Sequence, residues 1–68
     1  MYKGQIYIKV HDTIMERDTW INTEHIVTFY AGDAEDKRIF KASTVIEMSN
    51  GRIKVSDTVD EICERLVS

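Results

Sequence analysis

Three side chains of this sequence could act as a nucleophile, a general base or a soft metal ligand, namely His11, His25 and Cys63. They lie far apart along the chain, without the close Cys and His pairs that zinc sites use. A catalytic thiol needs a nearby base and contact with solvent. Cys63 instead lies among the apolar residues of a predicted helix, where cysteine behaves as a small hydrophobe. We therefore expect no metal site, no cofactor and no cysteine nucleophile.

The remaining polar residues form no catalytic motif. The sequence has twelve carboxylates, so a neighbouring pair such as Asp60 and Glu61 carries no weight for acid–base catalysis. The start of a helix accounts for these two acids, because negative charge is favourable there. The three glycines form no phosphate-binding loop, and no serine lies in a nucleophile elbow. We expect a protein that is not an enzyme.

The last part of the chain, residues 43–68, carries the clearest structural pattern. Asn50-Gly51 lies between two runs of β-forming residues, and it predicts a type I′ hairpin turn in which both central residues have a positive φ. This turn would place Met48 opposite Ile53, and Glu47 opposite Lys54. Because side chains alternate between the faces of a strand, one face of the hairpin would be apolar. Its members would be Ile46, Met48, Ile53 and Val55.

The hairpin leads into a predicted helix over residues 58–67. Thr58 and Glu61 have the spacing of a capping box, in which each residue bonds the backbone of the other. Apolar residues then recur every three or four positions, which predicts one buried stripe. The stripe consists of Val59, Ile62, Cys63, Leu66 and Val67. We expect it to pack on the sheet face that carries Ile46 and Val55.

The N-terminal half of the chain predicts further strands. Residues 6–11 alternate between apolar and polar side chains, as in a half-buried strand. A second strand is expected within residues 14–21. Its adjacent Trp20 and Ile21 place one large apolar side chain on the outer face in either register.

A short turn should separate the second strand from the third. Asn22 is expected to accept hydrogen bonds from the backbone of this turn, residues 23–25. Residues 26–30 follow as a third strand, with Val27 and Phe29 on one face.

The charged segment over residues 31–38 predicts a surface loop. Ile39 and Phe40 follow it, and they either extend the fourth strand or form a hydrophobic flap. The whole chain, residues 1–68, thus predicts one small α+β domain: an antiparallel sheet of about five strands with one C-terminal helix. A sheet this small could curl into a partly open barrel.

Size and charge restrict the partners of the chain. A protein of 68 residues buries only about 60% of the surface of its unfolded form. Because Cys63 is the only cysteine, an internal disulfide cannot add stability, and we expect a homodimer. The net charge of −3 makes nucleic acid an unfavourable partner, since non-specific binding depends on neutralising phosphates.

The sequence indicates a cytoplasmic protein. No run approaches the roughly 18 apolar residues that a membrane-spanning helix needs, so we expect no membrane partner. Residues 1–5 contain no apolar core of a signal peptide. Together with the lone thiol, this absence points to a reducing compartment.

Aromatic residues gather in the N-terminal half, beside the charged segment. Aromatic side chains surrounded by charge are typical of protein interfaces, so we expect a protein partner. The candidate interaction residues are Trp20, Tyr30, Phe40, Asp33, Glu35 and Asp36. The alternative is that Trp20 and Phe29 fill the core of a domain that is too small to be packed with aliphatic residues alone.

Several short motifs occur in a characteristic order. They are Ile8-Lys9-Val10, the segment from Trp20 to Val27, the segment from Ser43 to Gly51, and Val55 followed by Thr58-Val59-Asp60-Glu61-Ile62. This order resembles the FlbD-like family of small flagellar and swarming motility proteins. The chain departs from the family in its first turn, residues 11–16, and in its longer central connection, residues 31–42. The resemblance implies a non-enzymatic accessory protein without catalytic residues.

Two other functions compete with this one. Short length and acidity favour a small phage or mobile-element protein that inhibits a host protein, with an acidic surface that imitates nucleic acid. A DNA-binding regulator is the third interpretation, since the strand, Asn-Gly turn, strand and helix resemble half of a LytTR-type DNA-binding domain. The lack of basic residues on the loops argues against it.

Overall fold

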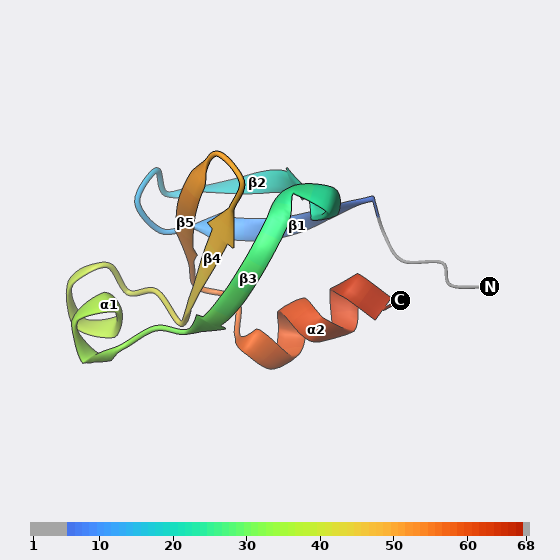
Figure 1. Ribbon diagram of the computed structural model, residues 1–68. Coiled ribbons are helices and arrows are strands. Elements are labelled where there is room, and N and C mark those ends of the chain that lie inside the picture. Colours follow the sequence, from blue (N-terminus) through green and yellow to red (C-terminus); the bar gives the residue numbers. More distant parts are fainter. Residues whose placement is uncertain (1–5, 68) are drawn as a thin grey trace.

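The structure is a computed structural model that describes residues 6–67 (Figure 1). The expected absence of a signal peptide concerns residues 1–5, which lie outside the described part. Five strands form an antiparallel sheet in the order β2-β1-β5-β4-β3. The elements are β1 (Tyr7–Asp12), β2 (Arg17–Asn22), the 3-10 helix η1 (Thr23–His25), β3 (Ile26–Ala31), α1 (Ala34–Ile39), β4 (Thr44–Met48), β5 (Gly51–Val55) and α2 (Val59–Val67). The α+β fold is as expected, and the sheet does not close into a barrel.

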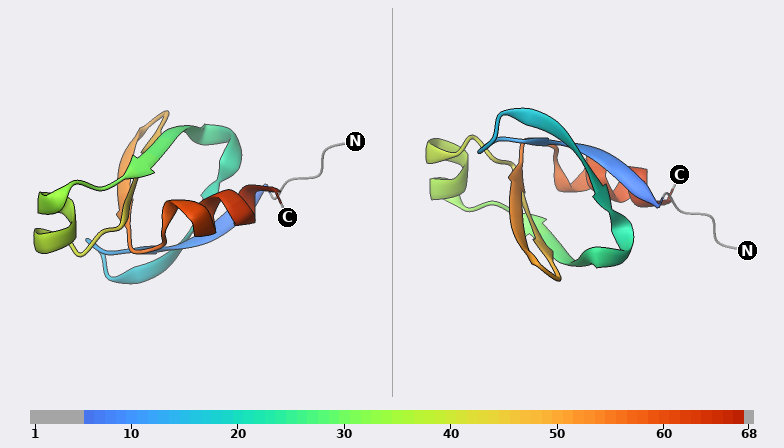
Figure 2. Two further views of the ribbon diagram at one scale, coloured as in Figure 1. Left: turned by 90° about the horizontal axis from the view of Figure 1, so that it is seen from below. Right: turned by 90° about the horizontal axis from the view of Figure 1, so that it is seen from above.

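The sheet consists of two ribbons joined by a narrow seam. One ribbon is the β1–β2 hairpin, and the other is the β3-β4-β5 meander. Among the described residues, β1 pairs with β5 only where Asp12 lies opposite Val55. Two backbone hydrogen bonds flank this position: the Thr13 amide donates to the Lys54 carbonyl at 3.0 Å, and the Ser56 amide donates to the His11 carbonyl at 3.1 Å. The ribbons therefore bend away from each other, and α2 lies across the open side of the sheet (Figures 1 and 2).

The core lies between this bent sheet and α2. It is formed by the inward-facing side chains of β1, β2, β4 and β5 together with one residue of α2: Ile8, Val10, Ile21, Ile46, Val55 and Ile62. Ile62 is fully buried beside Ile46 and Val55, which confirms the expected packing of the helix on that face. Burying one such aliphatic side chain contributes about 1.5–3 kcal/mol.

Asp57 and Arg65 hold α2 against β1. The Asp57 carboxylate accepts a hydrogen bond from the His11 amide at 2.7 Å and from Arg65 Nη1 at 2.6 Å. Arg65 Nη1 also donates to the Lys9 carbonyl at 3.0 Å. At the start of the helix, Thr58 and Glu61 form the expected capping box. Both ends of α2 are thus fixed by polar contacts in addition to its apolar face.

The predicted hairpin register is wrong by two residues. Met48 lies opposite Gly51, Ile46 opposite Ile53, and Glu47 opposite Arg52. Because the shift is even, the same side chains still face the core. The loop residues are Ser49-Asn50, and Asn50 lacks the positive φ of a type I′ turn.

Contacts with η1 explain this register. The Ser49 amide donates to the His25 carbonyl at 2.9 Å, and the Ser49 hydroxyl lies 3.1 Å from His25 Nδ1. These bonds hold Ser49 in the loop and place Gly51, with a φ of 146°, at the start of β5. The expected role of Asn22 is confirmed, since its side chain accepts from the Glu24 amide at 2.9 Å.

A β-bulge changes the face of one residue in the third strand. Ile26 pairs with Met48 and Thr28 with Glu47, which leaves Val27 as the extra residue. Ile26 and Phe29 consequently both pack against the core, while Val27 is 69% exposed. The expectation that Val27 and Phe29 share a face was wrong for this reason.

The predicted loop over residues 31–38 is also wrong, because α1 forms there. Asp33 caps this helix: its side chain accepts from the Asp36 amide at 2.8 Å, and the Asp36 side chain accepts from the Asp33 amide at 3.1 Å. In the first hairpin, the Asp12 carboxylate accepts from the amides of Ile14 and Met15. These residues therefore form a turn, and β2 starts at Arg17, later than expected.

Cys63 does not belong to the buried stripe of α2. Its side chain is exposed, whereas the preceding Ile62 is fully buried. Successive helical residues differ by about 100° around the axis, so Ile62 and Cys63 cannot both point into a narrow contact face. Val67 is exposed as well, and the predicted stripe was too wide.

Candidate protein-interaction site

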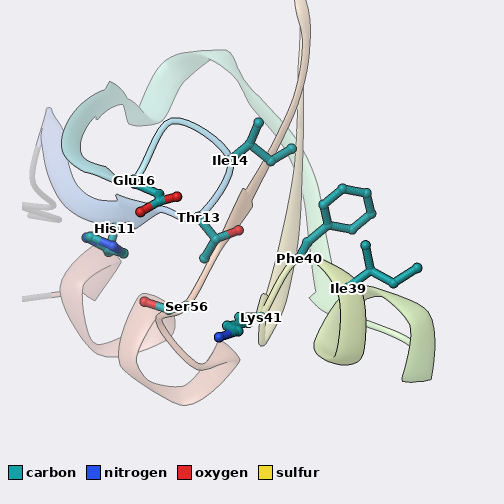
Figure 3. A pocket seen from close by; sticks show the side chains of 8 residues that line it. All are labelled: His11, Thr13, Ile14, Glu16, Ile39, Phe40, Lys41 and Ser56. Atoms are coloured by element: carbon teal, nitrogen blue, oxygen red, sulfur yellow. The ribbon is translucent and has the colours of Figure 1, made fainter.

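A hollow of about 530 Å³ lies over the seam between the two ribbons. We call it the α1 hollow. Its lining residues come from the end of β1, the β1–β2 turn, the end of α1 and the segment after β5: His11, Thr13, Ile14, Glu16, Ile39, Phe40, Lys41 and Ser56. Figure 3 shows Ile14, Phe40 and Ile39 together on one side of this hollow and the polar side chains on the other.

Local backbone geometry presents the apolar side of the α1 hollow. The Asp12 carboxylate holds the β1–β2 turn and thereby positions Ile14. On the same side, Phe40 caps the C-terminal end of α1, and the following Lys41 has a φ of 55°, the left-handed conformation that ends many helices. Ile14 and Ile39 are 55% and 51% exposed. Two large aliphatic side chains thus stay in contact with water at one place.

The polar side of the hollow is built on the end of β1. The His11 ring lies with its Nδ1 3.0 Å from Asp18 Oδ1 on the neighbouring strand β2. This hydrogen bond with His11 lowers the pKa of the Asp18 carboxyl below its ordinary value. Within residues 6–67, no group of three or more His, Cys, Asp and Glu side chains is arranged to hold a metal ion. The arrangement is suited to binding an apolar side chain beside polar groups.

Of the predicted interaction residues, Phe40 lies on this hollow, whereas Tyr30 lies on the edge strand β3. Phe40 lines it directly, and the Lys54 ammonium group lies 4.9 Å from the centroid of the Phe40 ring. Tyr30 is exposed on β3, and its hydroxyl donates to Glu47 Oε2 at 2.8 Å. This hydrogen bond to a carboxylate raises the pKa of Tyr30. Glu47 also pairs with Arg52 at 3.2 Å.

The three predicted acids differ in their surroundings. Asp33 and Asp36 bond each other's backbone in the capping box of α1, and the Asp36 carboxylate also binds the Lys54 ammonium group. The hydrogen bond from Lys54, followed by that from the Asp33 amide, lowers the pKa of Asp36. Glu35 is exposed in the first turn of α1. Asp33 and Asp36 are thus committed to the fold.

Trp20 lies apart from the other candidates. It is 65% exposed on β2 and lines a second hollow of about 540 Å³, next to the turn between β4 and β5. The alternative that Trp20 fills the core is therefore wrong, whereas Phe29 does pack against the core. The predicted interaction residues are therefore not gathered in one place: four lie at α1, Tyr30 lies on β3 and Trp20 lies on β2.

Ile14 and Ile39 were missed as candidates for binding. The sequence carried a weak signal for each of them, because both are aliphatic residues next to charged or polar segments. Ile39 was considered as part of a hydrophobic flap, and its position at the rim of the hollow is close to that description. Ile14 could not be found in this way, because its proximity to Phe40 depends on how β1, β5 and α1 are arranged.

No helix within residues 6–67 has the length and apolar character needed to cross a membrane. Comparisons of the chain with family models, with curated proteins and with solved structures found no match.

Proposed function

We propose that this chain is a non-enzymatic interaction module that binds a protein partner through the α1 hollow. The observation that carries this proposal is the exposure of Ile14 and Ile39 on the same side of the hollow as Phe40. Apolar residues at the centre of a patch with a polar rim are typical of protein interfaces. Each square ångström of apolar surface that a partner covers contributes roughly 25 cal/mol.

The biological role that we propose is that of a regulatory accessory of the FlbD-like kind. Support comes from the order of the sequence motifs described above and from an α+β fold with a C-terminal helix. A reducing, cytoplasmic location fits the exposed thiol of Cys63, because free thiols persist where disulfides do not form.

The acidic inhibitor from a phage or mobile element is the second candidate. It would need a row of free carboxylates, but Asp33 and Asp36 serve the capping box and Lys54. Glu35 is exposed and takes no part in the capping box. The geometry favours recognition of an apolar group over imitation of nucleic acid.

DNA binding is the least favoured function. Within residues 6–67, three basic side chains make ion pairs with carboxylates: Arg52 with Glu47, Lys54 with Asp36 and Arg65 with Asp57. Together with a net charge of −3, these pairs reduce the positive charge that could bind phosphate groups. A gel-shift assay at low salt should therefore show no retardation of DNA, and a retarded band would restore this interpretation.

A capture experiment with matched variants tests the proposed binding site. The full chain, the double variant Ile14→Asp/Ile39→Asp and the control Val67→Asp are immobilised and exposed to a lysate of the source cells. Val67 is also an exposed aliphatic residue, but it lies on α2, away from the hollow. We expect proteins that the wild type and the control capture and the double variant does not. Equal capture by all three would contradict a role for the α1 hollow.

A further inference from the structure

β2 forms one edge of the sheet. A hydrogen bond at its end shows which of its backbone groups point toward β1 and which point outward. The Thr23 amide donates to the Ile6 carbonyl at 2.8 Å. In an antiparallel pair, residues that exchange hydrogen bonds alternate with residues whose amide and carbonyl groups point outward. From the register of β1 and β2, Thr19 and Ile21 bond β1, whereas Asp18 and Trp20 direct their backbone groups away from it.

The two edges of the sheet differ in their ability to accept another strand. β3, at the opposite edge, contains the bulge at Val27, which interrupts its regular pairing and is a common way to blunt an edge. β2 pairs with β1 in a continuous register over all six of its residues. Trp20, at 65% exposed, stands in the middle of this regular edge. An added strand would therefore pair with β2.

We propose that a second copy of this chain occupies the edge of β2, in an antiparallel pair related by a two-fold axis at Trp20. Because Asp18, Trp20 and Asn22 are the outward-directed residues, the axis can lie at any of the five positions from 18 to 22. A centre at Asp18 would oppose two carboxylates, which is destabilising. A centre at Thr19 would oppose Asp18 and Trp20, and a centre at Ile21 would oppose Trp20 and Asn22. A centre at Asn22 would leave Asp18 and Trp20 without a partner within β2. Only the centre at Trp20 opposes Asp18 with Asn22 twice and pairs the two tryptophans.

The side chains of this register are chemically complementary. Cross-strand aromatic pairs stabilise a sheet, which gives the exposed Trp20 a partner. Asn22 already uses its Oδ1 to accept from the Glu24 amide, and its amide group can donate to the Asp18 carboxylate of the other copy. Because one strand pair buries less area than standard interfaces of about 1,600 Å², we expect a reversible dimer in the micromolar range. This dimer goes beyond the proposed function, since the α1 hollow lies on other elements and stays accessible.

The oligomeric state of the full chain tests the proposal. Sedimentation velocity from about 5 to 500 µM should show a dimer whose fraction grows with concentration. Trp20→Lys places two ammonium groups at the axis and should leave a monomer over the whole range. The matched control Val27→Lys changes a side chain of similar exposure on the opposite edge and should dimerise like the wild type. A monomeric wild type, a dimeric Trp20→Lys variant or a monomeric Val27→Lys variant would overturn the proposal.

Charge complementation tests the position of the axis. An equimolar mixture of Trp20→Lys and Trp20→Glu should form a mixed dimer, because opposite charges then face each other. Failure of the mixture to associate would refute the register. Amide hydrogen exchange of the wild type needs no substitution: protection of the Asp18 and Trp20 amides should rise at least about tenfold with concentration, while that of Phe29 on the other edge stays constant. Unchanged protection at Asp18 and Trp20 would equally overturn the pairing.

Discussion

The ammonium group of Lys54, on the central strand of the sheet, binds the carboxylate of Asp36 on α1. The side chains of Lys54 and Asp36 are only 18% and 12% exposed, so water screens this ion pair less than a surface pair. Lys54 also lies against the ring of Phe40. One side chain of the sheet therefore fixes the helix that forms a wall of the α1 hollow.

Lys54→Met should lower the stability of the protein in a pH-dependent way. Lys54 lowers the pKa of Asp36 in the folded state below its ordinary 3.8. The resulting stabilisation is therefore complete above pH 3.8 and is lost as the pH falls through the lower folded pKa. Urea unfolding should show the largest difference between variant and wild type at pH 7, and the difference should shrink below pH 3.8. The control is Lys37→Met, since Lys37 is an exposed lysine of α1, the helix that carries Asp36. This substitution should change the free energy of unfolding little at either pH. A difference that is independent of pH would show that the loss comes from packing on Phe40.

Gly32→Ala should destabilise the protein by about 1–3 kcal/mol, as expected for overpacking. A Cβ atom at this position would lie 2.9 Å from the Asp36 Cβ and 3.1 Å from the Ala42 carbonyl oxygen. Because Asp36 is held by the capping box and by Lys54, it can move only by weakening these contacts. Thermal unfolding measures the loss, and an unchanged midpoint would mean that α1 shifts without cost.

Gly51→Ala should cost about 1–3 kcal/mol through backbone strain alone. The φ of Gly51 is 146°, and a Cβ atom there would meet no other atom within 4 Å. The matched control Asn50→Ala should change the free energy of unfolding by less than about 0.5 kcal/mol, because Asn50 lies in an exposed loop without a positive φ. A comparable loss for both variants would favour the type I′ turn instead, because both central residues then have a positive φ.

Asp57→Ala should destabilise the protein by about 1–3 kcal/mol. The substitution leaves the His11 amide and the Arg65 guanidinium group without the carboxylate that they share. Asp60→Ala is the control, since Asp60 is exposed in the first turn of α2. This substitution should cost less than about 1 kcal/mol. Chemical denaturation compares the two variants; equal losses would assign the effect to helix charge alone.

The elements that could be predicted are those with several agreeing local signals. The regular alternation of residues 6–11 predicts a strand, and β1 forms there with bounds shifted by one residue, Tyr7–Asp12. The capping box at Thr58 starts the helix in which Ile62 is buried. α1 was missed because it has only six residues and an Asp33–Asp36 cap within a strongly charged segment. Charge alone made this segment resemble a loop.

The misses in the sheet have a common physical cause. The bulge at Val27 and the hairpin register both follow from contacts between distant segments, such as the Ser49 amide with the His25 carbonyl. Such contacts leave no periodic pattern in the sequence. The same holds for the candidate site: Phe40 was found by residue type, whereas Ile14 depends on the three-dimensional arrangement of the turn and α1.

The seam between the ribbons lies directly beneath the α1 hollow. Within residues 6–67, β1 and β5 pair there through a single residue pair. The hollow is lined by His11 and Thr13 from one side of this seam and by Ser56 from the other. A partner bound in the hollow would contact both ribbons across the part of the sheet with the fewest strand-to-strand hydrogen bonds. Binding would then reduce the motion of one ribbon relative to the other without any rearrangement of the strands.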